Sequence, residues 1–366
     1  MDVFIISDAI FLIIASARPP MLIARELAKE FNVMFIAPKI CLTAAKTLKS
    51  MGINFFETGG ILVFPTKSLV MFYSWAMDVI LNNISYKVNE IIKKKEDAII
   101  LNFSNTAMVK SLAWYAQGMF YPALIDIVNS ATNPSTQITK PGLWVIKLLD
   151  AIHVRRMRAF SKLIIANSIF TRRMYESAGI KVDKIIYPPL DTKEYSPTTN
   201  SPTEDYALTY IGKETDFRVM KKILDSGVKI KAFGGKFGMI PKSVLKHKNF
   251  EYLGFVSTRN LIDLYSNALF TLFPFSHEPF GYVPLESLAC GTPVLTYNKQ
   301  GPAEIIQHGK NGWLVNSCTE LVRLAKEIWD KGVPSEMRKE ARKRALEFSV
   351  EKIAKEWIQL INTSAG

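Results

Sequence analysis

The sequence predicts an α/β protein of two domains, each with a parallel β-sheet whose strands are connected by helices. The first reason is length, because 366 residues exceed the usual size of one domain. The second is pattern: short apolar runs alternate with segments of helical period along both halves of the chain, as expected where helices cross over between parallel strands. The third is the stretch 188–203, whose four prolines among Ser, Thr and Asn have the composition of a linker.

The first half is expected to open with a buried strand. Its apolar start is flanked by Asp2 and Asp8 and has no basic leader, which disfavours a signal peptide. Apolar runs in this half predict strands at Val3–Ser7, Val33–Ala37, Ala98–Phe103, Ala123–Val128 and Lys162–Ala166. Helical periodicity predicts helices at Pro20–Phe31, Leu42–Met51, Thr106–Gln117 and Gly142–Arg158.

The second half repeats the alternation. Strands are expected at Tyr206–Ile211, Ile230–Phe233, Phe250–Leu253, Phe270–Phe273 and Pro293–Tyr297, with a helix over Pro284–Ala289. We therefore expect an N-terminal domain over 1–188 and a C-terminal domain over 189–347. The remaining residues, 348–366, include an amphipathic segment, and we expect this terminal helix to pack back on the N-terminal domain.

Composition narrows the class of protein. The chain is 48% hydrophobic and 22% charged, as in globular proteins that bury a core, and no apolar run reaches the roughly 20 residues of a membrane span. Cys41, Cys290 and Cys318 lack metal spacing, which favours free thiols in a reducing cytoplasm. Five Gln with abundant Lys and Ile hint at a thermophilic, archaeal source.

Positive charge gathers in the first half. The formal net charge is +13, and residues 1–190 carry +9 of it, from 22 Lys and Arg against 13 Asp and Glu. Such a surplus fits either an acidic partner, such as an anionic membrane surface, nucleic acid or a phosphorylated acceptor, or simple solubility.

Residues 277–295 contain most of the residues that predict a ligand-binding site. In residues 277–295, HEPFGYVPLESLACGTPVL, an expected strand is followed by Glu278 and Gly281, then by a helix that carries Glu286. Glycine lets backbone amides approach a ligand closely, and a helix N-terminus favours an anion such as a diphosphate. Carboxylates can accept hydroxyl hydrogen bonds from a sugar or a ribose. Two glutamates at this spacing could also be surface charges, but their coincidence with the glycines and the strand–loop–helix context favours a ligand site.

This segment resembles the donor-site signature of the retaining glycosyltransferases of family 4, also called glycosyl transferases group 1. The shared pattern is Glu-Pro-Phe-Gly, then Glu-Ser-Leu-Ala, then Gly-Thr-Pro-Val. Other matching segments are Ala166–Arg172, Ile186–Thr192, Gly301–Ile306 and Gly309–Val315. The resemblance covers residues 163–362 and weakens before them. It implies the GT-B fold, in which two Rossmann-like parallel-sheet domains face each other across a cleft.

The resemblance also implies which residues bind a nucleotide-sugar donor. By this resemblance Glu286 holds the ribose hydroxyls, and Glu278 contacts the donor sugar. Backbone amides near Phe280 and Gly281 join Glu278, and Tyr282 is expected to bind the donor as well.

For the diphosphate the family uses an Arg and a Lys five residues apart after the first strand of the donor domain. Here Lys213, next to Gly212, and Arg218 stand in those places with the two residue types exchanged, so the charge is kept while the contacts differ. The donor base is expected beside Phe255, in the segment Tyr252–Val256.

The expected chemistry is metal-independent transfer with retention. The chain has no Asp-x-Asp motif, so we expect no metal and no cofactor, the nucleotide sugar being a co-substrate. Lys213, Arg218 and the helix N-terminus would stabilise charge on the leaving diphosphate. We assign the catalytic roles to Glu278, Lys213, Arg218 and Asp126.

Asp126 is assigned because the sequence departs from the family. The resemblance calls for a histidine at the end of a first-domain strand, but the stretch Tyr121–Asn129 has none, so Asp126 or Asn129 is expected there. The glycine-rich turn after the first strand is replaced by Ala15–Arg18, and His277 is expected behind the donor loop.

The acceptor is expected to be a carbohydrate or a lipid-linked molecule. In the predicted helix 142–158, Trp144, Ile146 and Leu149 precede Arg155, Arg156 and Arg158, the pattern of a membrane-interfacial helix or of a core helix with a solvated basic end. We expect a cytoplasmic protein, peripheral on the inner face of the membrane if the first reading holds.

Two other readings stay open. The chain could be a non-catalytic nucleotide-sugar-binding protein or another sugar-nucleotide enzyme of the same fold, such as an epimerase or a sugar-phosphate synthase. A nucleic-acid binder ranks third, because no helix-turn-helix, zinc or Gly-aromatic RNA motif occurs.

Overall fold

The computed structural model describes residues 1–11, 15–59, 83–93, 95, 97–130, 143–202, 204–235 and 237–365. The chain divides into two compact units. Unit 1 comprises Met1–Tyr121, Thr139–Pro189 and Val350–Gly366, and unit 2 comprises Pro122–Ile138 and Leu190–Ser349. None of the helices in the described part of the chain has the length and apolar character needed to cross a bilayer.

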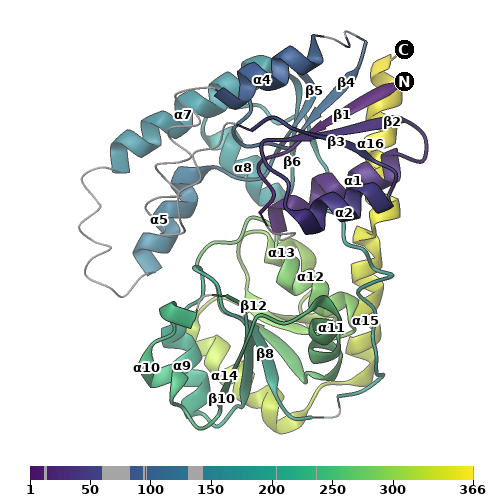
Figure 1. Ribbon diagram of the computed structural model, residues 1–366. Coiled ribbons are helices and arrows are strands. Elements are labelled where there is room, and N and C mark those ends of the chain that lie inside the picture. Colours follow the sequence, from purple (N-terminus) through teal and green to yellow (C-terminus); the bar gives the residue numbers. More distant parts are fainter. Residues whose placement is uncertain are drawn as a thin grey trace. The chain divides into compact units, whose positions relative to one another are not determined.

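Unit 1 is built on a parallel sheet (Figure 1), with the strand order β3-β2-β1-β4-β5-β6-β7 among the described residues. Its strands are β1 (Asp2–Ile6), β2 (Asn32–Ala37), β3 (Asn54–Glu57), β4 (Ile99–Asn102), β5 (Ser111–Ala116), β6 (Ser161–Ala166) and β7 (Lys184–Ile185). Its helices are α1 (Arg18–Leu27), α2 (Leu42–Ser50), α4 (Asn83–Ile92), α7 (Leu143–Phe160), α8 (Ile169–Ser177) and α16 (Val350–Ala365), with a 3₁₀ turn at Ala15–Ala17. The order reverses direction between β1 and β4, which makes this pair the switch point of the sheet.

The terminal helix α16 belongs to the core of unit 1. Figure 1 shows it beside α1, and the two helices are in contact. Trp357 is 1% exposed, with its ring centroid 5.0 Å from that of Phe103 and 5.5 Å from that of Tyr115. Burying a side chain of this size stabilises a fold by about 3 kcal/mol, so α16 is an integral element of unit 1.

Unit 2 has a second parallel sheet, with the order β10-β9-β8-β11-β12-β13 in the part of the chain that the structure describes. Its strands are β8 (Ala207–Tyr210), β9 (Ile230–Phe233), β10 (Phe250–Gly254), β11 (Phe270–Phe273), β12 (Val294–Tyr297) and β13 (Gly312–Val315). Its helices are α9 (Phe217–Asp225), α10 (Lys242–Leu245), α11 (Thr258–Asn267), α12 (Tyr282–Ala289), α13 (Pro302–Ile305), α14 (Cys318–Lys331) and α15 (Ser335–Ala345), with 3₁₀ turns at Phe237–Met239 and Leu346–Phe348. Its switch point lies between β8 and β11.

Helix α15 is joined to two other segments of unit 2 by hydrogen bonds from Arg342. Arg342 Nη1 donates to the carbonyl oxygens of Tyr195 (2.6 Å) and Ala289 (2.8 Å), and its Nη2 donates to that of Thr192 (2.8 Å). Ala289 is the last residue of α12, whose final carbonyls lack partners within the helix. The guanidinium therefore ties the end of α12 to residues within the linker stretch 188–203.

Two expected elements were wrong. The apolar run Ala123–Val128 lies in a helix, α5 (Phe120–Ser130), and the expected helix Thr106–Gln117 contains strand β5. The first error has a tertiary cause: the buried Asp150 carboxylate accepts a 2.8 Å hydrogen bond from the Tyr121 N–H, which caps the start of α5. The second run, Ser111–Ala116, is buried on both faces of a central strand, where continuous apolar residues have no period-2 pattern.

Candidate functional site

At the switch point of unit 2, the loops that follow β8 and β11 are fastened to each other. Thr215 and Phe275 form an antiparallel bridge. The Ser276 N–H donates to the Glu214 carbonyl at 2.8 Å, and the Asp216 N–H donates to the Pro274 carbonyl at 2.9 Å. Ligands bind at such carboxyl-terminal edges, so this double loop is the framework of the candidate site.

The turn into α12 depends on two glycines. Gly281 has φ of 115°, a conformation that side chains with a Cβ rarely adopt, and it begins α12 without any side-chain cap. A Cβ on Gly301 would lie 2.3 Å from Phe280 Cα, so only glycine lets the loop after β12 pack on the Phe280 backbone. The first turn of α12 is thereby brought next to the loop of Glu278, with its positive dipole end toward that loop.

Glu278 is half-buried in this loop. Its carboxylate accepts a hydrogen bond from the Phe280 N–H at 3.3 Å, and its own N–H donates to Gln300 Oε1 at 2.6 Å. Burial, helped by the nearby Glu214 charge, raises the pKa of Glu278 to about 8, although Lys213 acts in the opposite direction. At neutral pH the carboxyl group of Glu278 is therefore largely protonated.

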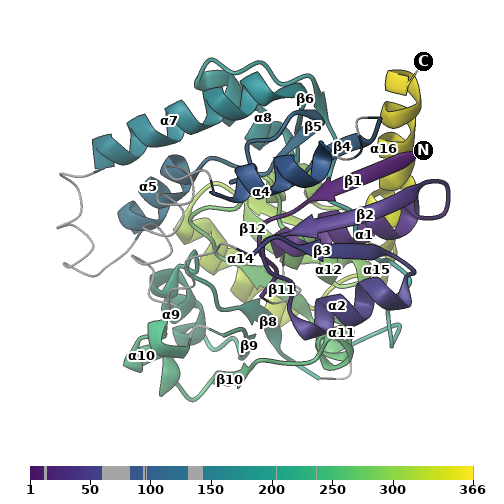
Figure 2. The same ribbon diagram turned by 45° about the horizontal axis from the view of Figure 1, so that its top comes forward.

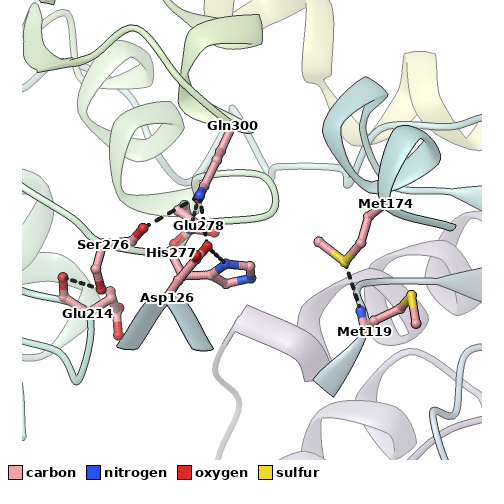
Figure 3. Close-up of polar contacts among 8 residues, drawn as sticks. All are labelled: Met119, Asp126, Met174, Glu214, Ser276, His277, Glu278 and Gln300. Atoms are coloured by element: carbon pink, nitrogen blue, oxygen red, sulfur yellow. Dashed lines mark hydrogen bonds and ion pairs between the residues drawn. The ribbon is translucent and has the colours of Figure 1, made fainter. Parts of the chain in front are cut away.

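A hydrogen-bond network from α5 supports the same loop (Figure 3). His277 Nδ1 lies 2.8 Å from Asp126 Oδ2, and Gln300 Nε2 donates to that same oxygen at 3.1 Å. Burial lowers the pKa of His277 despite the Asp126 charge, so the neutral ring donates from Nδ1 to the carboxylate. Gln300 has φ of 57°, a left-handed conformation unusual for a side chain of this kind, and thus holds a strained position in order to bridge Asp126 and Glu278.

This arrangement corrects the expectation for Asp126. It does not stand at the end of a first-domain strand; it lies in α5 and is grouped with unit 2, because the run we expected to be a strand is a helix. The residue that follows β5 is instead Gln117, whose Nε2 donates to the Phe103 carbonyl at 3.3 Å.

Glu286 lies deeper, at 3% exposure on the buried side of α12. The Tyr265 hydroxyl donates to its Oε2 at 3.1 Å, and burial together with the Glu286 charge raises the pKa of Tyr265 well above its usual value. Burial also raises the pKa of Tyr210 to about 12, with further increases from Glu214, Glu278 and Glu286. The carboxyl groups of the two signature glutamates therefore act on one common tyrosine, although they are eight residues apart.

The cations of the site differ in their surroundings. Lys213 is exposed, and its charge acts on both Glu278 and His277. Arg218 lies in the first turn of α9, 62% exposed, with Nε 3.7 Å from Asp216 Oδ1. Asp216 caps that helix by accepting from the N–H groups of Arg218 and Val219. The structure thus places Lys213 near the carboxyl groups, and Arg218 beside an aspartate.

The remaining predicted residues have these positions. A Cβ on Gly212 would lie 2.5 Å from Glu214 Oε1 and 2.6 Å from Tyr210 Cε1, so a larger residue there would require these side chains to move. Phe255 is 78% exposed, with its ring against Gly235 beyond the ends of β9 and β10. The half-buried Tyr282 packs edge-on against Phe280, with ring centroids 5.5 Å apart. Sequence reasoning missed Gln300 and Tyr265; the only available signal was that Gln300 follows a predicted strand and precedes Gly-Pro.

A cavity of about 420 Å³ lies beyond the ends of β11, β12 and β13. It is lined by Asp126, Asp216, Phe275, Ser276, Tyr297, Asn298, Lys299, Val315, Asn316, Ser317 and Cys318. A second cavity, of about 500 Å³, lies at the amino ends of β8, β9 and β10, and none of the predicted site residues lines it. Among the described residues, no group of three or more His, Cys, Asp or Glu side chains could hold a metal ion, and metal independence stays a prediction.

The architecture defines the class of fold. The two parallel-sheet units have the GT-B fold, as in solved structures of that class. One is the structure of HepE from Anabaena in complex with UDP-glucose, which superimposes with a TM-score of 0.71 over 99% of this chain and 100% of that one, at 15% sequence identity.

Sequence comparisons match parts of the chain. Residues 241–348 match the family described as "Glycosyl transferases group 1". Over 117 residues the chain is 34% identical to a probable sucrose-phosphate synthase of Thermosipho melanesiensis, and over 113 residues 34% identical to an uncharacterized glycosyltransferase of Methanocaldococcus jannaschii. Each match covers 30% of this chain, and the chain spans only 27% and 29% of the lengths of these relatives.

Proposed function

We propose that this protein is a nucleotide-sugar-dependent glycosyltransferase, which moves a hexose from a nucleoside-diphosphate sugar to an acceptor hydroxyl with retention of configuration. The observation that carries the proposal is the position of Glu278, Glu286 and the start of α12 directly after β11, at the switch point of unit 2, with a glycine as the N-cap of α12. The match of residues 241–348 to the glycosyl transferases group 1 family supports the proposal. So does the sequence similarity to a probable sucrose-phosphate synthase and to an uncharacterized glycosyltransferase.

The electrostatics of the site suit a leaving diphosphate. Breaking the glycosyl–phosphate bond builds negative charge on the diphosphate, which Lys213 and the positive end of the α12 dipole would stabilise. Arg218 would join them by exchanging its contact with Asp216 for one with phosphate. These groups belong to the protein, so the proposal needs no metal ion.

Glu278 can help because its pKa is raised to about 8. A protonated carboxyl group donates one hydrogen bond and accepts others, so it can hold a sugar hydroxyl at neutral pH without placing a negative charge beside the diphosphate. Glu286 would accept from the ribose hydroxyls, and Phe255 would stack on the base. These assignments extend the family resemblance to the geometry described above.

We also propose a carbohydrate or lipid-linked acceptor and a cytoplasmic location, peripheral on the inner face of the membrane. The basic first half of the chain supports this, because an anionic surface or a phosphate-linked acceptor would be attracted to it.

The test is a thermal-shift panel of nucleoside diphosphates and nucleotide sugars in the presence of EDTA. A ligand at about 100 times its dissociation constant adds about 2.7 kcal/mol to stability. We expect one donor to stabilise the wild type and Glu336→Ala, an exposed control on α15, but not Glu286→Ala. No shift with any nucleotide would refute the donor site.

Transfer is then tested by incubating the stabilising donor with candidate acceptors and determining the product anomer by NMR. An α-linked product from an α-configured donor is expected. Binding without donor hydrolysis or transfer would favour the alternative, a non-catalytic nucleotide-sugar-binding protein. An inverted product would remove retention from the proposal.

A further inference from the structure

Helix α7 of unit 1 presents apolar side chains to solvent. Trp144 is 68% exposed, Leu148 52%, Val145 39% and Ile152 38%. Residues four apart lie on one face of a helix, so Trp144, Leu148 and Ile152 form a single stripe with Val145 at its side. No other helix in the described part of the chain exposes more than one large hydrophobic side chain. The sequence pattern named Trp144, Ile146 and Leu149, of which Trp144 is exposed while Ile146 and Leu149 are half-buried.

The opposite face of α7 holds the helix in place. Val154 and Met157 pack in a cluster with Trp114 and Ile164 of strands β5 and β6. Asp150, the only acidic residue of α7, is 2% exposed and caps α5. The two views agree that the carboxyl half of α7 lies beside β6, while its amino half, which carries Trp144 and Leu148, runs past the sheet (Figures 1 and 2). The inner face of α7 thus packs on the sheet, and the outer stripe has no part in this packing.

Cations accompany the stripe. Arg155 and Arg156 are exposed one turn beyond Ile152, and Lys147 is exposed between the apolar positions. Arg158, by contrast, donates to the Ser161 carbonyl at 2.9 Å and belongs to the fold. With Asp150 buried, the outer face of α7 has positive charge and no negative charge. Apolar side chains flanked by cations are typical of helices that lie in the interface of an anionic bilayer.

We propose that α7 docks unit 1 onto the surface of an anionic lipid bilayer. Trp144, Val145, Leu148 and Ile152 enter the boundary between headgroups and acyl chains, and Arg155 and Arg156 pair with lipid phosphates. The docking follows from α7 alone. Its consequence for the reaction, that the acceptor is presented from the bilayer as a lipid-linked molecule, rests on the proposed function.

The experiment is flotation of the full chain with phosphatidylcholine vesicles, alone or mixed with phosphatidylglycerol. The variants are Leu148→Ser with Ile152→Ser, and Arg155→Glu with Arg156→Glu. The matched controls are Leu42→Ser, at a site 82% exposed, and Lys46→Glu, both on α2 of the same unit.

We expect binding to mixed vesicles only, and release by high salt. The arginine reversal should lower the partition coefficient about thirtyfold or more, since each cation near an anionic surface contributes about 1 kcal/mol. The serine pair should lower it at least about tenfold, since each apolar side chain that leaves the interface loses most of its transfer free energy. Both controls should bind like the wild type.

Several results would overturn the proposal: no flotation with anionic vesicles, equal flotation with neutral ones, or wild-type binding by both α7 variants. A concentration-dependent dimer that the serine pair dissolves, without vesicle binding, would show that a second copy covers the stripe. Each variant is also tested for its nucleotide thermal shift. Vesicle binding without any nucleotide shift would leave the docking standing while the proposed function fails.

Discussion

The two sheets fill their switch points in opposite ways. In unit 1, Asp8 follows β1, and its carboxylate accepts hydrogen bonds from the Asn105 N–H at 3.0 and 3.2 Å, the Thr106 hydroxyl at 3.0 Å and the Ser104 hydroxyl. These donors form the turn after β4. In unit 2 the corresponding loops carry Gly212 and Gly281, and Gly281, the N-cap of α12, has no side chain with which to cap the helix.

The difference shows how one architecture separates two tasks. The donors that could hold a phosphate in unit 1 are already committed to the chain's own carboxylate. In unit 2 Gly212 and Gly281 occupy the comparable loops, and the acidic side chains there are Glu214, Asp216 and Glu278, of which Glu278 has a raised pKa. The switch point of unit 2 therefore suits an anionic ligand. At the switch point of unit 1 the same kinds of donor stabilise the fold by binding Asp8.

The largest expected effect comes from changing Glu286 to its amide, which tests the binding role of unit 2. We predict that Glu286→Gln lowers affinity for the stabilising nucleotide about a hundredfold, because two hydrogen bonds to a charged acceptor contribute about 1.5 kcal/mol each. Isothermal titration calorimetry measures it. An unchanged dissociation constant would show that the ribose binds elsewhere.

The matched change in unit 1 is Asp8→Asn. We predict a loss of about 2 kcal/mol in the free energy of unfolding, because the amide NH₂ faces donors that the carboxylate satisfied. The nucleotide dissociation constant should stay within about twofold of the wild-type value. Urea unfolding and calorimetry measure the two quantities. Weaker nucleotide binding with normal stability would break the distinction between the units.

Gln300 tests whether the loop of unit 2 must be held in place. Gln300→Ala should lower kcat/KM for transfer about tenfold, because it frees the Glu278 N–H and one side of Asp126. Gln300→Gly, which removes the same bonds but relieves the strain at φ of 57°, should be more stable than Gln300→Ala by about 1 kcal/mol. Equal activity of both variants and the wild type would exclude a positioning role.

The smallest expected effect is the pH dependence of Glu278. Its pKa of about 8 predicts that nucleotide affinity falls several-fold as pH rises through 8, because the newly ionised carboxylate repels the diphosphate. The folded state holds this proton more tightly than the unfolded state. The resulting stability is complete below the ordinary pKa of 4.5 and is lost as pH rises toward 8. Binding by Glu278→Gln should be flat over that range, and the same slope in the variant would assign the effect to another group.

Local chemistry was enough to predict most of unit 2. The strand, the glycine turn and the helix around Glu278 follow from residue types within twenty positions, and each of the five strands expected in unit 2 is present. What the sequence could not supply are contacts between distant segments. Asp126 meets His277 across 151 positions, and its apolar neighbours resemble a strand until Asp150 caps the helix. Gln300 follows the end of a strand, but a glutamine at this place predicts neither a left-handed backbone nor side-chain hydrogen bonds to Glu278 and Asp126.

The contacts of Arg342 in α15 determine which residues must be kept together if unit 2 is transferred to another protein. Arg342 needs the carbonyls of Thr192 and Tyr195 as much as that of Ala289. If the chain up to residue 195 were left behind, the half-buried Arg342 would keep one of its three carbonyl acceptors. The destabilised end would be that of α12, the helix that carries Glu286. An exchange of unit 2 between proteins of this fold would therefore succeed only where linker residues such as Thr192 and Tyr195 are transferred with the sheet that follows them in the chain.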